Sequence, residues 1–190
     1  MSGFDDEEVG WMWWFAFLAL VVWALSVVLG SAQSYNRAEW THWVDEDGDC
    51  LTTRHEVLAS ESLIAPTITD CRVVGGLWRD PYTDHLHANP SDLDIDHVVS
   101  LYEAHVSGGD LWSADKKRRY ANDLQNPQHL VATAASINRG KGAADPSRWV
   151  PDVDVCGYIS RWVDIKARYR LAYDAEESAA IVRYLGKCPR

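Results

Sequence analysis

Within residues 93–99, apolar and polar residues first alternate and the last two are both apolar. This pattern predicts a β-strand that ends inside a hydrophobic core. A second short apolar run, over 129–134, predicts another strand. Ser136 is a suitable N-cap for a helix whose first turns carry polar and basic side chains. The centre of the fold is therefore expected to read strand, strand, helix.

Helical spacing of apolar residues dominates the C-terminal part of the chain. It predicts two amphipathic helices, over 157–169 and 175–185, that close the domain. Shorter helices are expected to begin near Thr53 and to cover 116–122. Residues 71–78 are expected to form a strand that leads, through Gly75-Gly76, to another strand. This mixture of helices and strands predicts an α+β class.

The N-terminal segment is apolar on all sides from Trp11 to Leu29 and is long enough to cross a bilayer once. It predicts one transmembrane helix before the folded domain. The small residues at 30–32 would also suit a signal peptidase, so cleavage and release remain an alternative. The expected segments are an acidic tail (1–10), an anchor or uncleaved signal (11–30), a tether (31–36) and one domain (37–190).

Four cysteines stand in the domain, and none forms a Cys-x-x-Cys pair, which argues against a zinc site. An even number of cysteines suits two disulfides formed in an oxidising compartment. Three pairings are open, and we expect Cys50–Cys71 and Cys156–Cys188 because each closes a local loop. The domain is therefore expected on the extracytoplasmic side of the membrane, or secreted if the N-terminal segment is cut.

The net charge of −10 at pH 7 is unfavourable for a nucleic-acid partner, but the charge is unevenly distributed. Residues 1–110 contain 4 Lys/Arg and 19 Asp/Glu, whereas residues 111–190 contain 14 and 9. The basic run at 116–119 is either a solvated helix face or a surface that grips phosphates. Its members are Lys116, Lys117, Arg118 and Arg119.

The residue types that phosphodiester hydrolysis needs occur close together in the sequence. Asp96-His97 offers a carboxylate and an imidazole, Asn126 a carboxamide, and Asn138 to Lys141 a further carboxamide with two cations. An imidazole titrates near neutral pH and suits a general base. Asp and Asn oxygens suit Mg²⁺, Mn²⁺ or Ca²⁺.

An acidic loop provides a candidate for a second metal ion, a structural Ca²⁺. Asp45, Asp47, Asp49 and Glu56 stand at positions 1, 3, 5 and 12 of an EF-hand-like register. Position 6 of that register should be glycine and here is Cys50. A solvated turn beside a disulfide is the alternative.

Further residues extend a pattern shared with one family. They are Arg37, Trp40, His42-Trp43, Asp47-Gly48-Asp49-Cys50, Thr53-Arg54, Glu56-Val57-Leu58, Cys71, Gly76, Trp78, Pro81-Tyr82, Asp96-His97-Val98-Val99, Ala121-Asn122-Asp123-Leu124, Asn138-Arg139, Lys141-Gly142, Pro146, Trp149, Pro151 and Cys156. With them the chain resembles the HNH (ββα-metal) endonucleases, in particular the secreted branch related to the C-terminal domain of GmrSD-type restriction enzymes. The resemblance covers most of the domain.

The resemblance implies a role for each candidate residue. His97 would be the general base, and Asp96 and Asn138 would ligate one divalent metal ion. The remaining implied roles are orientation of the loop or the base (Asn126) and contact with phosphate (Arg139 and Lys141).

The chain departs from the family at two positions. Ser100 stands where the family usually has proline, and His105 stands where it tends to have tryptophan. Neither departure removes a proposed catalytic group.

The sequence thus predicts an exported, membrane-tethered, metal-dependent endonuclease with little sequence preference, acting on DNA and, as a further substrate, RNA. No recognition helix or zinc finger points to readout of bases. Two alternatives lack catalysis: a tethered nucleic-acid-binding module and a Ca²⁺-stabilised interaction domain. No protein partner can be inferred.

Overall fold

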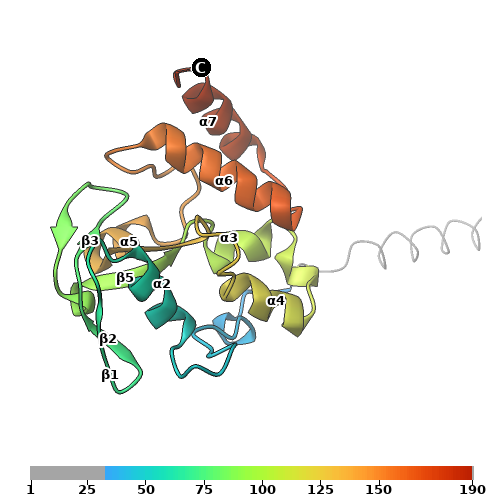
Figure 1. The fold of residues 1–190 in the computed structure, drawn as a ribbon. Coiled ribbons are helices and arrows are strands. Elements are labelled where there is room, and N and C mark those ends of the chain that lie inside the picture. Colours follow the sequence, from blue (N-terminus) through green and yellow to red (C-terminus); the bar gives the residue numbers. More distant parts are fainter. Residues whose placement is uncertain (1–32, 190) are drawn as a thin grey trace, which may run out of the picture. The chain divides into compact units, whose positions relative to one another are not determined.

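A two-stranded antiparallel sheet, β5 (Leu93–His97) and β6 (Leu130–Ala134), lies at the heart of residues 33–189, which this computed structural model describes (Figure 1). The register places His97 opposite Leu130. Helix α5 (Ala135–Lys141) follows β6 directly and packs on both strands. The predicted order of strand, strand and helix is confirmed.

The side chains of β5 alternate between an apolar and a polar environment, because successive residues of a strand point to opposite faces. Leu93 and Ile95 join a core with Val57 and Leu58 of helix α2 (Thr53–Glu61). Asp94 and Asp96 make their polar contacts with α5 instead. The strand therefore presents apolar side chains to one helix and carboxylates to another.

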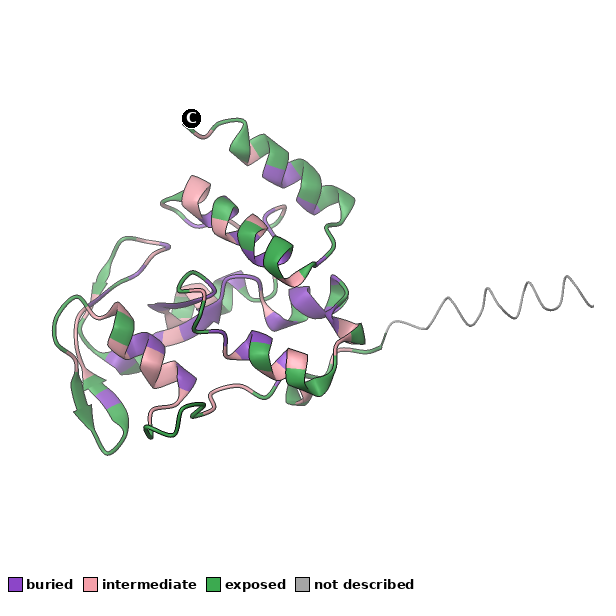
Figure 2. Ribbon diagram, turned by 45° about the vertical axis from the view of Figure 1, so that its right-hand side comes forward, coloured by how far each residue is buried: buried purple, intermediate pink, exposed green. Residues whose placement is uncertain are grey.

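A second core, rich in aromatic rings, lies among the helices, and it includes Trp40, Tyr120 and Trp162. Figure 2 shows the buried residues on the helix faces that point inward. The helices involved are α3 (Leu101–Val106), α4 (Ala114–Ala121), α6 (Val155–Tyr169) and α7 (Ala175–Leu185). The two C-terminal amphipathic helices are thus confirmed, and α6 begins two residues earlier than predicted.

The strand predicted from Cys71 ends at Gly75 rather than at Trp78, and another strand follows beyond Gly76, as the pair Gly75-Gly76 indicated. Two short hairpins stand there: β1 (Thr67–Thr69) with β2 (Arg72–Gly75), and β3 (Trp78–Arg79) with β4 (Leu86–His87). The break falls at Gly76, where a Cβ would lie 2.5 Å from a ring carbon of Trp78. Short 3-10 turns complete the described chain: η1 (Arg37–Glu39), η2 (Pro90–Asp92) and η3 (Gly109–Leu111).

The predicted N-cap of α5 is wrong. The cap is Ala134, the last residue of β6, and Ser136 lies inside the first turn. Asp80 holds this junction, because its Oδ2 accepts hydrogen bonds from Ala134 N (2.7 Å) and Thr133 Oγ1 (2.9 Å). The strand can therefore pass into the helix without a capping side chain.

The two disulfides connect Cys50 with Cys71 and Cys156 with Cys188, as predicted. They complete an α+β domain whose class is confirmed. In the part of the chain that the structure describes, no helix is long and apolar enough to cross a membrane. The predicted tail (1–10) and anchor (11–30) lie outside that part, as does the start of the tether (31–36).

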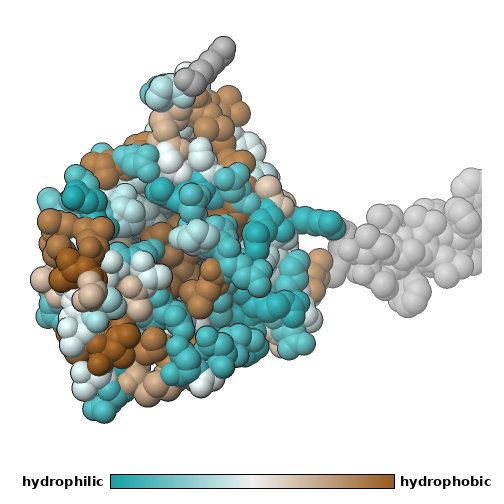
Figure 3. Space-filling view, in the orientation of Figure 1, coloured by the Kyte–Doolittle hydropathy of each residue, from teal (hydrophilic) through white to brown (hydrophobic). Residues whose placement is uncertain are grey.

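The surface differs between the hairpins and the helices. Exposed apolar side chains lie on and around the hairpins, where Figure 3 shows brown patches over β3 and the β1–β2 pair. They are Leu63, Ile64, Ile68, Val74 and Leu86. The face over α4 is mainly hydrophilic in the same view.

Candidate functional site

The imidazole of His97 is held in one orientation by the end of α4. Its Nε2 lies 3.0 Å from the carbonyl oxygen of Ala121. Because a carbonyl only accepts hydrogen bonds, Nε2 must carry the proton, and Nδ1 keeps its lone pair. Burial, and then the neighbouring His129, lower the pKa of His97 well below its usual value. The ring is therefore neutral at neutral pH, which is the state that a general base requires.

Three rings surround His97. The rings of Trp43 and His129 have centroids 5.8 Å away, and Tyr120 is stacked at 6.3 Å. Tyr120 and His129 are fully buried, whereas Trp43 is partly exposed. His97 is itself only 6% exposed, and of the three rings around it only that of Trp43 is partly exposed.

Asp96, the neighbour of His97, forms a buried ion pair. Lys141 Nζ lies 2.9 Å from its Oδ1, and the hydroxyl of Tyr82 donates to its Oδ2 at 2.7 Å. Lys141 also donates to the carbonyl of His97 at 2.9 Å. Burial raises the pKa of Asp96, while Lys141 and Tyr82 act in the opposite direction. These contacts tie α5 to the strand at the position of the imidazole.

Asp96 and Asn138, which were expected to share a metal ion, do not meet. Both oxygens of Asp96 are already engaged and buried, while Asn138 Nδ2 donates to Asp94 Oδ2 at 3.2 Å. As arranged, this pair does not fit a shared metal ion. Asp94 and Asn138 are adjacent and half-buried, and they are the oxygen donors on this face that could hold a hard cation.

The predicted phosphate contacts divide into buried and exposed cations. Lys141 is fully buried at its side chain, and Lys117 is nearly so, with Nζ 2.6 Å from Glu39 Oε2. Neither is available to a phosphate in solution, because each already has a carboxylate partner. Arg139 is 77% exposed, although its Nε lies 3.7 Å from Asp94.

The basic run on α4 has two further members with different surroundings. Arg118 pairs with Glu46 of the acidic loop. Arg119 is exposed and has no carboxylate partner among the described residues, and Lys116 Nζ lies 4.0 Å above the ring of Trp112. Only part of the predicted run is thus available to a ligand.

Asn126 lies on the loop between α4 and β6. Its side chain accepts from Gln128 N at 3.0 Å, and its carbonyl accepts from His129 N at 3.0 Å. Asn126 therefore braces this loop, and the ring that the loop places against His97 is that of His129.

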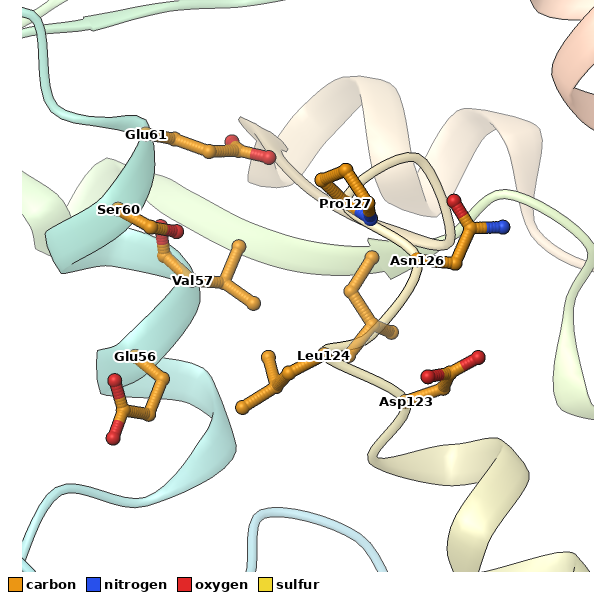
Figure 4. Close-up of a pocket in the computed structure, with 9 residues that line it drawn as sticks. Glu56, Val57, Ser60, Glu61, Asp123, Leu124, Asn126 and Pro127 are labelled. Atoms are coloured by element: carbon orange, nitrogen blue, oxygen red, sulfur yellow. The ribbon is translucent and has the colours of Figure 1, made fainter.

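A cavity of about 280 Å³ separates this loop from α2. Figure 4 shows Val57 and Glu61 of α2 on one side and Leu124 and Asn126 of the loop on the other. Burial raises the pKa of Glu61 to about 7, although its Oε2 accepts from Ala132 N at 2.8 Å. The cavity thus combines an apolar lining with a carboxyl group that titrates near neutral pH.

The acidic loop brings the carboxylate oxygens of Asp45, Asp47 and Asp49 within 4.8 Å of one another. Cys50 adopts φ 79°, the left-handed conformation that an EF-hand-like register requires at position 6, and its N–H donates to Asp45. Burial, and then Asp49, Asp47 and Asp45, raise the pKa of Glu56. These residues could hold a calcium ion.

Sequence reasoning did not foresee the contacts of several residues that shape the site. Tyr82 and His129 carry no local pattern that marks them as partners of Asp96 and His97. Asn122 links three segments: its side chain accepts from Thr53 Oγ1 at 2.8 Å and donates to Thr41 O at 2.8 Å. Asn122 and Tyr82 stand among the residues that carry the family resemblance, but the resemblance did not say which residues they contact.

The fold and site together define a disulfide-linked α+β domain in which a strand, strand and helix unit carries a buried, neutral histidine. No protein-family model and no solved structure matches the chain. The chain is 34% identical over 161 residues to an uncharacterized secreted protein of Arthroderma benhamiae, across 84% of this chain and 78% of that protein. The chain belongs to the same family as that protein.

Proposed function

We propose that this protein hydrolyses phosphodiester bonds in nucleic acid, with His97 as the general base. The observation that carries the proposal is the hydrogen bond from His97 Nε2 to the Ala121 carbonyl, which leaves Nδ1 as a proton acceptor. The lowered pKa of His97 keeps that nitrogen unprotonated at neutral pH. An attacking water would lose its proton to Nδ1.

The proposed substrate is DNA, with RNA as a further substrate, and cleavage has little sequence preference. Exposed cations, among them Arg139 and Arg119, support an anionic substrate. Lys141 acts within the protein instead, since it fixes the carbonyl of His97 and the carboxylate of Asp96. It is a positioning residue in this proposal.

A divalent ion would offset charge on the scissile phosphate and the leaving oxygen. The arrangement of Asp96 and Asn138 does not support the ligand pair that the resemblance implies, so the metal requirement remains a prediction. Asp94 and Asn138 are the alternative donors. A separate structural Ca²⁺ is proposed at the acidic loop.

We also propose that the domain works outside the cytoplasm. Two disulfides suit an oxidising compartment, and the relative from Arthroderma benhamiae is described as secreted. Tethering to the membrane through residues 11–30 remains a prediction from their apolar sequence.

Cleavage of DNA by the oxidised full chain tests the proposal, with EDTA, Mg²⁺, Mn²⁺ or Ca²⁺ present. His97→Gln should lower the rate about 10²- to 10⁴-fold, the usual contribution of a general base. His85→Gln is the matched control, because His85 is exposed on a loop between two short strands. Undiminished cleavage by a purified His97→Gln protein would refute the role of His97.

A second candidate lacks catalysis: a Ca²⁺-stabilised interaction or nucleic-acid-binding domain. The nearly complete burial of His97 and the closed pair of Asp96 with Lys141 favour it, because both resemble structural contacts. The interaction domain predicts melting that depends on Ca²⁺, the nucleic-acid-binding module predicts DNA binding without turnover, and neither predicts cleavage under any metal. The same assay therefore separates the two candidates.

A further inference from the structure

Four cations from two distant parts of the sequence gather on one surface. Lys116 and Arg119 lie on α4, while Arg168 and Arg170 lie at the C-terminal end of α6, on the same side of the fold (Figure 1). We call these four residues the α4–α6 basic surface. A depression of about 490 Å³ is lined by three of them, Lys116, Arg119 and Arg168.

The cations of this surface are poorly compensated. Arg168 has a carboxylate nearby, with Nε 3.4 Å from Asp123 Oδ2. Arg119 and Arg170 form no ion pair with any residue of the described chain. Partial burial, and then the charges of Arg170 and Arg119, lower the pKa of Lys116. Lys116, Arg119 and Arg170 thus repel one another, and a bound polyanion would relieve that repulsion.

The depression adjoins the residues that hold the imidazole. Ala121, whose carbonyl accepts from His97, is the last residue of α4, and Asn122 and Asp123 line the depression. A strand of nucleic acid gripped here would therefore lie against the segment that positions the proposed base.

We propose that the α4–α6 basic surface binds the phosphodiester backbone of the nucleic-acid substrate. This inference rests on the proposed function and names its binding surface. Compared with the basic run that the sequence suggested, this surface leaves out Lys117, which is paired with Glu39. It gains Arg168 and Arg170 at the end of α6. Because contacts of these cations with phosphates carry no sequence information, the surface should bind without base preference.

The test measures binding of a labelled single-stranded oligonucleotide to the oxidised full chain in EDTA, over a range of salt concentrations. The variant combines Arg119→Gln with Arg170→Asn, since Arg170 has φ 56° and asparagine tolerates that conformation. We expect about tenfold weaker binding. The slope of log Kd against log salt should fall by about 1.4, since each lost phosphate contact contributes about 0.7.

Arg183→Gln on α7 is the matched control, because it removes an exposed cation elsewhere and should leave Kd within about twofold. Lys116→Gln is a second, single variant that should weaken binding without altering a helix cap. Unchanged affinity and slope in folded variants would overturn the proposal. So would binding of anionic lipid vesicles that responds to these substitutions while the oligonucleotide does not bind.

Cleavage assays on the same variants separate this inference from the proposed function. If the variants lose binding and no protein cleaves DNA under any metal, the surface stands and the nuclease proposal fails. If they cleave with unchanged KM while His97→Gln does not cleave, the nuclease stands and the surface is wrong.

Discussion

Lys141 Nζ lies 2.9 Å from Asp96 Oδ1, and both side chains are almost completely withdrawn from solvent. The pair connects α5 to β5 beside His97, whose carbonyl accepts the second hydrogen bond of the ammonium group. A buried ion pair adds little stability by itself, but breaking it leaves an unpaired charge.

Replacing Lys141 with methionine should therefore destabilise the protein by about 3–5 kcal/mol, because Asp96 would remain buried without its counterion. The midpoint of urea unfolding measures this loss. Adding Asp96→Asn should recover part of it, since the amide needs no counterion. Lys187→Met, at an exposed position, is the control, and equal stability of all three variants would contradict the prediction.

The pH dependence of His97 has a definite sign. The pKa of His97 is lower in the folded protein than in the unfolded chain. Below about pH 6.5 the unfolded chain therefore binds more protons than the folded protein does. The free energy of unfolding thus decreases as the pH falls through this range. His97→Gln should flatten the fall in stability between pH 6.5 and 5. In the same range the wild-type cleavage rate should hold its plateau, because the base stays neutral. A rate that halves at pH 6.5 would count against this assignment.

Glu61 should produce the opposite trend. Its pKa rises to about 7 on folding, so the folded state holds a proton that the unfolded state releases, and stability falls as pH rises from 4.5 to about 7. The loss of stability is on the order of 3 kcal/mol. Glu61→Gln keeps an acceptor for Ala132 N and should remove the trend. Denaturant unfolding at pH 5 and pH 8 measures it, and identical pH dependence in both proteins would refute the prediction.

Calcium should stabilise the protein through the acidic loop. At a concentration 100 times its Kd, Ca²⁺ would add about 2.7 kcal/mol, because it binds only the folded loop. Asp47→Asn should abolish the rise in Tm, whereas Asp152→Asn, at an exposed position outside the loop, should not. Equal Tm with Ca²⁺ and with EDTA in the wild-type protein would rule out this site.

The sequence by itself determined the elements whose pattern is local. Alternation over 93–97 made β5, helical spacing made α6 and α7, and cysteines in separate halves of the domain paired within those halves. The pair Gly75-Gly76 also indicated where one strand gives way to the next, but the sequence did not show that the ring of Trp78 packs against Gly76.

The partners of the candidate site were decided only by the tertiary structure. The sequence indicated that Asp96, His97, Asn138 and Lys141 act as a group. It could not show that Lys141 forms an ion pair with Asp96, the carboxylate that was expected to bind a metal ion. The types of residue in a sequence limit which contacts are chemically possible. Which of these contacts form depends on the packing of α4 and α5 against the sheet, because burial makes an unpaired charge costly and selects the pairs that satisfy it.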